Sequence, residues 1–96
     1  MKVTFHRLAE TELTEAAQYY QLESPGLGAA FLAEAERTVA SVSDSPEAGT
    51  LVHAAVRRRL LRRFPYGILY SHTESEVRIL AVMNLKRRPS YWVGRT

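Results

Sequence analysis

Two short stretches of the sequence gather side chains that could bind or cleave a phosphate group. The first, RRRLLRRF, places five arginines between residues 57 and 63. The second, NLKRRPSYW, combines three basic with two aromatic side chains: Lys86, Arg87, Arg88, Tyr91 and Trp92. Arginine and lysine bind phosphate and stabilise charge that develops on it, and a tyrosine or a lysine with a lowered pKa could move protons. Any function assigned to the chain must use or explain these two stretches.

Metal and cofactor chemistry is not indicated by the sequence. The chain has no cysteine, and its three histidines, His6, His53 and His72, are scattered without ligand spacing. Neither His53 nor His72 has a neighbouring Asp or Ser that would suggest a catalytic triad. We therefore predict no metal, no cofactor and no role for His53 or His72.

Charge is distributed unevenly along the 96 residues. Residues 1–50 carry three basic and eight acidic side chains, a net charge of −5, whereas residues 51–96 carry ten basic and two acidic ones, a net charge of +8. Such a split predicts a face that meets phosphate or an acidic protein surface. No apolar run is long enough for a membrane span and no secretion signal is present, so we expect a cytoplasmic protein without a membrane partner.

The first half of the chain predicts one strand and two helices. VTFHR at 3–7 alternates as a strand does, and SPGLG at 24–28 contains a proline and glycines that break a helix. Between and after these segments, apolar residues recur at spacings of three and four. The expected buried positions are Ala9, Leu13, Ala16, Ala17 and Tyr20 in the first helix, and Phe31, Leu32, Ala35, Val39 and Val42 in the second, which should end near Ser43.

The second half predicts three strands, at 56–64, 66–72 and 76–83, joined as a meander. The order β-α-α-β-β-β indicates an α+β fold, a small antiparallel sheet with the helical hairpin packed on one face. We expect residues 1–96 to form a single domain.

Alternation along the first meander strand divides its side chains between two faces. Val56, Leu60 and Phe64 should lie under the helices, and the opposite face should carry the following four residues: Arg57, Arg59, Leu61 and Arg63. The next two strands, YGILY and ILAVM, are apolar on both faces, which is typical of strands covered on both sides. Because two helices cover one face, we expect a partner protein to cover Leu61, Leu69, Leu80 and Val82.

The ordered motifs PGLG, RRRLLRRFPYGILY, ILAVMN and RRPSYW resemble the RelE/ParE superfamily of bacterial type II toxins, and its ParE-like members in particular. The resemblance covers nearly the whole chain and implies the fold described above. It also implies a cognate antitoxin that wraps the toxin as a hetero-oligomer. The residues expected to contact that antitoxin are Arg57, Arg59, Leu61, Arg63, Leu69 and Leu80.

The resemblance leaves two targets open. ParE-like members inhibit DNA gyrase, for which the expected target-binding residues are Arg87, Arg88, Tyr91 and Trp92. RelE-like members cleave mRNA on the ribosome, for which the candidate catalytic residues are Arg59, Arg63, Lys86, Arg88 and Tyr91. Where many relatives carry a histidine, this chain has Asn84, which cannot act as a general base near neutral pH. A binding module that keeps the fold without toxicity is a third hypothesis.

Several of these residues also have a purely structural interpretation. The arginines of 57–63 could be a solvated edge that prevents strands of two molecules from pairing. Tyr66 and Tyr70 share a face with Ile68, so we expect them to pack rather than to react. Trp92 is as well suited to packing on the sheet as to stacking on a base.

Overall fold

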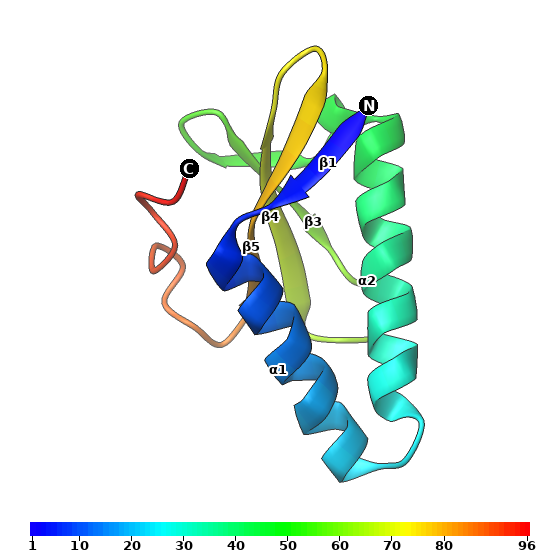
Figure 1. Ribbon diagram of the computed structural model, residues 1–96. Helices are drawn as coiled ribbons and strands as arrows, with labels where there is room; N and C mark the ends of the chain where they lie inside the picture. The colour runs from blue at the N-terminus through cyan, green and yellow to red at the C-terminus, as the bar shows by residue number, and fades with distance from the viewer.

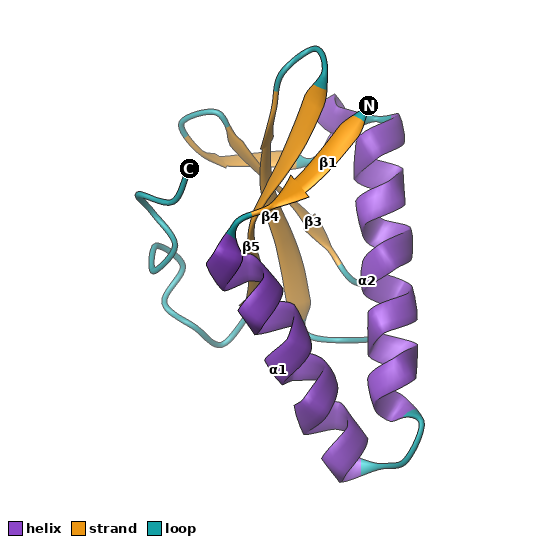
Figure 2. Ribbon diagram, viewed as in Figure 1, coloured by secondary structure: helices purple, strands orange, loops and turns teal.

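The computed structural model describes all 96 residues and shows an α+β fold, in which two helices pack on a five-stranded sheet (Figures 1 and 2). The elements follow one another as β1 (Lys2–Phe5), α1 (Arg7–Glu23), α2 (Leu27–Asp44), the 3-10 turn η1 (Pro46–Ala48), β2 (Thr50–His53), β3 (Val56–Leu60), β4 (Tyr66–His72) and β5 (Glu76–Asn84). The predicted fold class, helical hairpin and three-stranded meander are confirmed. Neither helix is long and apolar enough to cross a membrane.

The sheet differs from the prediction at both of its edges. The strand order is β1-β5-β4-β3-β2, and β1 runs parallel to β5, with Val3 opposite Val77, so the sheet is mixed rather than wholly antiparallel. At the other edge, the sequence predicts no strand between the second helix and residue 56, whereas the structure has β2 there. The β2–β3 hairpin could not be predicted because its turn contains neither glycine nor asparagine, the residues that usually mark such turns. Ala54 takes the left-handed conformation in their place, with φ of 48°.

The break between the helices and the end of α2 agree with the sequence, and the structure adds a cap at the start of α1. His6 caps α1 through its Nδ1, which accepts a hydrogen bond from the Leu8 N–H, and Gly26 takes a φ of 89° in the break before α2. At Gly28 a Cβ atom would come within 2.6 Å of the Ala17 carbonyl oxygen. Only glycine therefore allows the two helices to approach so closely at the closed end of the hairpin.

The main core lies between the helices and the sheet. Phe31 is fully buried, and its ring meets those of Tyr20, Phe64 and Tyr66 at centroid distances of 5.0 to 5.4 Å. Tyr70 is also buried, and its hydroxyl donates to the Pro46 carbonyl and accepts from the Gly49 N–H. The packing roles expected for Tyr66 and Tyr70 are confirmed.

The side chains of β3 face the opposite way from the prediction. Arg59 donates to the Ser41 hydroxyl on α2, and Leu61 is buried in the core beneath the helices, whereas Val56 packs on the far face of the sheet. Leu60 is half exposed, and Phe64 reaches the core as expected, but from the turn after β3, which ends at Leu60. The pattern is ambiguous because Leu60 and Leu61 are adjacent, so alternation alone fits either face.

The second face of the sheet is covered by the chain itself. Residues 85–96, here called the C-terminal segment, lie on the opposite side of the sheet from α2 (Figure 1). Trp92 is 3% exposed and packs against Leu69, Ala81 and Met83. The expectation that this face needs a partner protein to cover it is therefore wrong, since the segment supplies the apolar contact.

Candidate functional site

Glu12 of α1 fastens the C-terminal segment to the edge of β5. Its carboxylate accepts a hydrogen bond from the Tyr91 hydroxyl at 2.8 Å. The same carboxylate forms a bidentate ion pair with the Arg95 guanidinium, in which both N–O distances are 3.0 Å. We call Glu12, Tyr91 and Arg95 the Glu12 clasp. The side chains of Glu12 and Arg95 are 14% and 12% exposed. Because paired guanidinium and carboxylate groups form strong directional bonds, the clasp fixes where the segment lies.

The clasp also completes the hydrogen bonding of the sheet edge. β1 pairs with β5 only as far as Ile79, so the next backbone groups of β5 have no neighbouring strand. The Val82 N–H donates to Glu12 at 3.0 Å, and the Leu80 carbonyl accepts from Arg95 at 3.1 Å. Side chains from α1 and from the C-terminal segment thus replace the missing strand.

Tyr91 is held in its neutral form. Burial raises the pKa of its hydroxyl, and the hydrogen bond to the negatively charged Glu12 raises it further, outweighing the opposing effect of Arg95 and Arg87. The guanidinium carbon of Arg87 lies 3.9 Å from the centre of the Tyr91 ring, a cation–π contact. The hydroxyl is therefore unsuited to proton transfer near neutral pH, while the ring positions Arg87.

The remaining basic residues of the C-terminal segment are exposed. Lys86, Arg87 and Arg88, which we call the C-terminal basic surface, form no ion pair. The Asn84 side chain accepts from the Lys86 N–H at 2.9 Å and so shapes the turn that presents them. Trp92 donates from its ring nitrogen to the Pro89 carbonyl at 2.7 Å and is buried. Of the expected target-binding residues, Arg87 and Arg88 are at the surface, Tyr91 is half-buried and Trp92 faces the sheet.

A second group of basic residues lines a groove between α2 and the end of β3. We call it the cationic groove, and its arginines are Arg37, Arg59, Arg62 and Arg63. Glu34, which is 5% exposed, supplies one carboxylate that accepts from the backbone N–H groups of Arg62 and Arg63 and pairs with the Arg63 side chain at 3.1 Å. Burial raises the pKa of Glu34, but these hydrogen bonds and the Arg63 charge outweigh it and leave the pKa below its ordinary value.

The contacts divide the candidate catalytic residues between two places. Arg59 and Arg63 bind side chains of α2, whereas Tyr91 binds Glu12 of α1. No hydrogen bond or ion pair joins the arginines of the cationic groove to Lys86, Arg88 or Tyr91.

The residues expected to contact an antitoxin differ in their exposure, since the leucines are buried and two of the arginines are accessible. Leu61, Leu69 and Leu80 are at most 6% exposed and have almost no surface to offer a partner. Arg57 donates to the backbone carbonyls of Glu47 and Gly49 at 3.0 and 2.8 Å, so it braces the loop before β2. Arg59 and Arg63 remain accessible in the cationic groove.

Four residues of these sites were not predicted from the sequence: Glu12, Glu34, Arg37 and Arg95. Glu34 carried a signal, because it falls three residues after Phe31 on the apolar side of α2, where a carboxylate needs a buried partner. Nothing comparable marks Glu12, one of three glutamates near the start of α1. Its partners lie 70 to 83 residues away in the sequence, so only the folded chain reveals them.

A third surface feature is an apolar groove between α1 and α2. It encloses about 240 Å³ and is lined almost entirely by apolar side chains: Phe5, Leu13, Ala35, Val39, Ala40, Ile68 and Val82, with Glu36 as the polar member. The two helices diverge from their connecting loop (Figure 1), and both line the groove, Leu13 from α1 and Val39 from α2. The two grooves therefore flank α2 on opposite sides.

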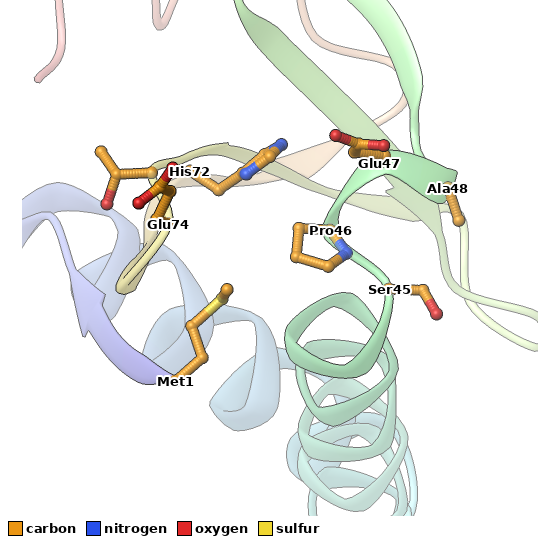
Figure 3. Close-up of a pocket in the computed structure, with 8 residues that line it drawn as sticks. Met1, Ser45, Pro46, Glu47, Ala48, His72 and Glu74 are labelled. Atoms are coloured by element: carbon orange, nitrogen blue, oxygen red, sulfur yellow. The ribbon is translucent and has the colours of Figure 1, made fainter.

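A further pocket lies where the loop after α2 meets the β4–β5 turn, and Figure 3 shows His72 extending toward Glu47 there. Met1, Pro46 and Glu74 line the same space. No group of three metal-ligating side chains is present anywhere in the structure.

Comparisons with known proteins give a consistent result. The family described as the ParE toxin of the type II toxin-antitoxin system, parDE, matches residues 3–89. Among solved structures, one described as a chromosomal ParDE TA system from P. aeruginosa superposes with a TM-score of 0.78 at 18% identity, covering 90% of this chain and 97% of that one. At that identity the likeness shows the fold alone. No curated protein sequence matches the chain.

Proposed function

Because the chain belongs to the ParE toxin family of type II toxin–antitoxin systems, we propose that it arrests bacterial growth by binding DNA gyrase in the cytoplasm and that a cognate antitoxin neutralises it. The family match over residues 3–89 carries the proposal, since membership of such a system implies an antitoxin partner. The fold shared with the P. aeruginosa ParDE structure supports it.

Gyrase binding is favoured over ribosome-dependent cleavage of mRNA by the arrangement of the candidate catalytic groups. A ribonuclease needs its proton-transfer and phosphate-binding groups around one phosphate. Here Arg59 and Arg63 are bound to α2, while the hydroxyl of Tyr91 is committed to Glu12 with a raised pKa. Asn84 adds no base, because an amide cannot take up a proton near neutral pH.

We assign the target contact to the C-terminal basic surface. Arg87 and Arg88 are exposed and unpaired, and the Tyr91 ring sets the direction of Arg87. Trp92 anchors the segment to the sheet and so acts by positioning the surface rather than by contacting the target. Exposed Leu85 and Val93 flank the basic residues and offer apolar contacts beside them.

We assign the antitoxin to the apolar groove between α1 and α2. An amphipathic segment could place apolar side chains against Leu13, Val39 and Phe5, which are accessible, in contrast to the buried leucines predicted from the sequence. Leu13 adjoins Glu12 of the clasp, and Val82, which also lines the groove, donates to Glu12. A bound antitoxin would therefore lie next to Glu12, whose contacts with Tyr91 and Arg95 position the C-terminal segment. A specific complex should bury roughly 1,200 Å² or more in total.

Inducible expression in a bacterial host tests the proposal. The chain alone should arrest growth, and co-expression of the protein encoded by the adjacent antitoxin gene should restore it, because the bound form is withdrawn from its target. Soluble expression is checked on the same cultures. Unimpaired growth with the chain soluble would contradict the toxin assignment, and arrest accompanied by cleaved mRNA would favour the ribonuclease.

A further inference from the structure

Most of the positive charge in the cationic groove is not neutralised by a carboxylate of the protein. Among its four arginines, Arg63 alone is paired with a carboxylate, that of Glu34. Arg59 is hydrogen-bonded to the neutral hydroxyl of Ser41 at 2.8 Å, and the exposed side chains of Arg37 and Arg62 form no hydrogen bond or ion pair. Three guanidinium groups in one groove thus lack an anionic partner, and their mutual repulsion favours binding of an anion.

The lining of the groove indicates the class of that anion. Apart from the arginines and Glu34 it consists of Thr38, Ser41 and Leu60, so it contains one apolar side chain and no aromatic ring. Arginine and serine side chains commonly contact the phosphate oxygens of a nucleic acid. The Ser41 hydroxyl accepts from Arg59 and keeps its own proton to donate, whereas the Thr38 hydroxyl donates to the Glu34 carbonyl. A protein partner normally brings an apolar or aromatic anchor, for which this groove has no pocket.

We propose that the cationic groove binds the phosphodiester backbone of a nucleic acid without reading its sequence. The absence of an aromatic side chain removes the platform on which unpaired bases stack, so the contact is with the backbone. The positive charge of Arg37, Arg59 and Arg62 then displaces counterions from the phosphates, which makes the binding dependent on salt. This inference does not rest on gyrase as the target.

Fluorescence anisotropy with a short labelled DNA duplex of arbitrary sequence tests the inference on the full chain. Affinity should fall as salt rises, with a slope of about 0.9 per phosphate contact in a double logarithmic plot. The double variant Arg37→Ala/Arg62→Ala should bind at least about tenfold more weakly at low salt, and its slope should be smaller by about two. Both side chains are exposed, so the variant should keep its fold, which circular dichroism checks.

The matched control is Lys2→Ala/Arg7→Ala, which removes the same charge from exposed positions outside the groove. This control should keep the affinity and slope of the natural chain. Equal losses in both variants would show that overall charge, not the groove, binds DNA, and would overturn the inference. Failure of the natural chain to bind the duplex, with binding of poly-glutamate or ATP instead, would equally overturn it and assign the groove to an acidic protein segment or a free nucleotide. None of these outcomes changes the growth-arrest or gyrase measurements, so the two proposals fail separately.

Discussion

At the scale of single residues, two glutamates from the helices hold the basic half of the chain in place. Glu12 is bound to Tyr91 by a hydrogen bond and to Arg95 by an ion pair, both in the C-terminal segment. Glu34 binds the turn after β3 through the backbone and side chain of Arg63. Both carboxylates are largely buried and accept hydrogen bonds from backbone and charged side chains at once. The two acids therefore position the surfaces to which we assign function, and Glu34 also lines the cationic groove.

Replacing Glu12 by glutamine should loosen the C-terminal segment. The change removes the charge that pairs with Arg95 and leaves buried donors poorly satisfied, so the free energy of unfolding should fall by about 1–3 kcal/mol. Trp92 is the sole tryptophan, so its fluorescence reports directly on whether the segment stays packed. We expect the Trp92 emission to be red-shifted in Glu12→Gln and unchanged in the exposed control Glu15→Gln. Equal emission spectra in the two variants would contradict the role of the clasp.

Glu34 should make stability depend on pH in the acid range. Its pKa is lowered on folding from an ordinary value of 4.5, so its charge contributes stability fully above that pH, and the contribution is lost as the pH falls through the lowered value. Glu34→Gln should lower the free energy of unfolding by about 1–3 kcal/mol at neutral pH and by less in acid. Denaturant titrations across this range measure the difference, with exposed Glu36→Gln as the control. A constant difference at every pH would refute this role.

At the scale of elements, the helical hairpin and the meander could be predicted, whereas the edges of the sheet could not. Helix spacing placed Ala9, Phe31 and Val42 in the core, and all three are fully buried. The parallel pairing of β1 with β5 joins residues more than 70 positions apart, which no local pattern encodes. The faces of β3 were reversed because Leu60 and Leu61 are adjacent. The cover of the second face was missed because the C-terminal segment has no regular periodicity.

The closed end of the helical hairpin should be intolerant of a single added methyl group. Gly28→Ala would place a Cβ atom 2.6 Å from the Ala17 carbonyl oxygen, and backbone cannot move aside as a flexible side chain can. The strain should outweigh the higher helix propensity of alanine and lower the free energy of unfolding by about 1–3 kcal/mol. Thermal unfolding monitored by circular dichroism provides the measurement. A variant as stable as the natural chain would show that the helices can separate at no cost.

At the scale of the whole molecule, three surfaces of different chemistry surround α1 and α2. The C-terminal basic surface adjoins the start of α1, the apolar groove lies between the helices, and the cationic groove lies on the other side of α2. The sequence predicted a basic and partly apolar surface from the charge of its second half. The apolar groove was not predicted, because most of its lining, including Phe5, Leu13 and Val39, lies in the acidic first half.

The supercoiling activity of DNA gyrase in the presence of the purified chain tests the central claim most directly. We predict that the chain inhibits supercoiling, that the antitoxin restores it, and that Arg87→Ala/Arg88→Ala loses the inhibition. Since both arginines are exposed and unpaired, that double variant should differ in stability by less than about 1 kcal/mol, so loss of inhibition would report on target contact rather than unfolding. Undisturbed supercoiling by a soluble chain that arrests growth and leaves cleaved mRNA would contradict the account.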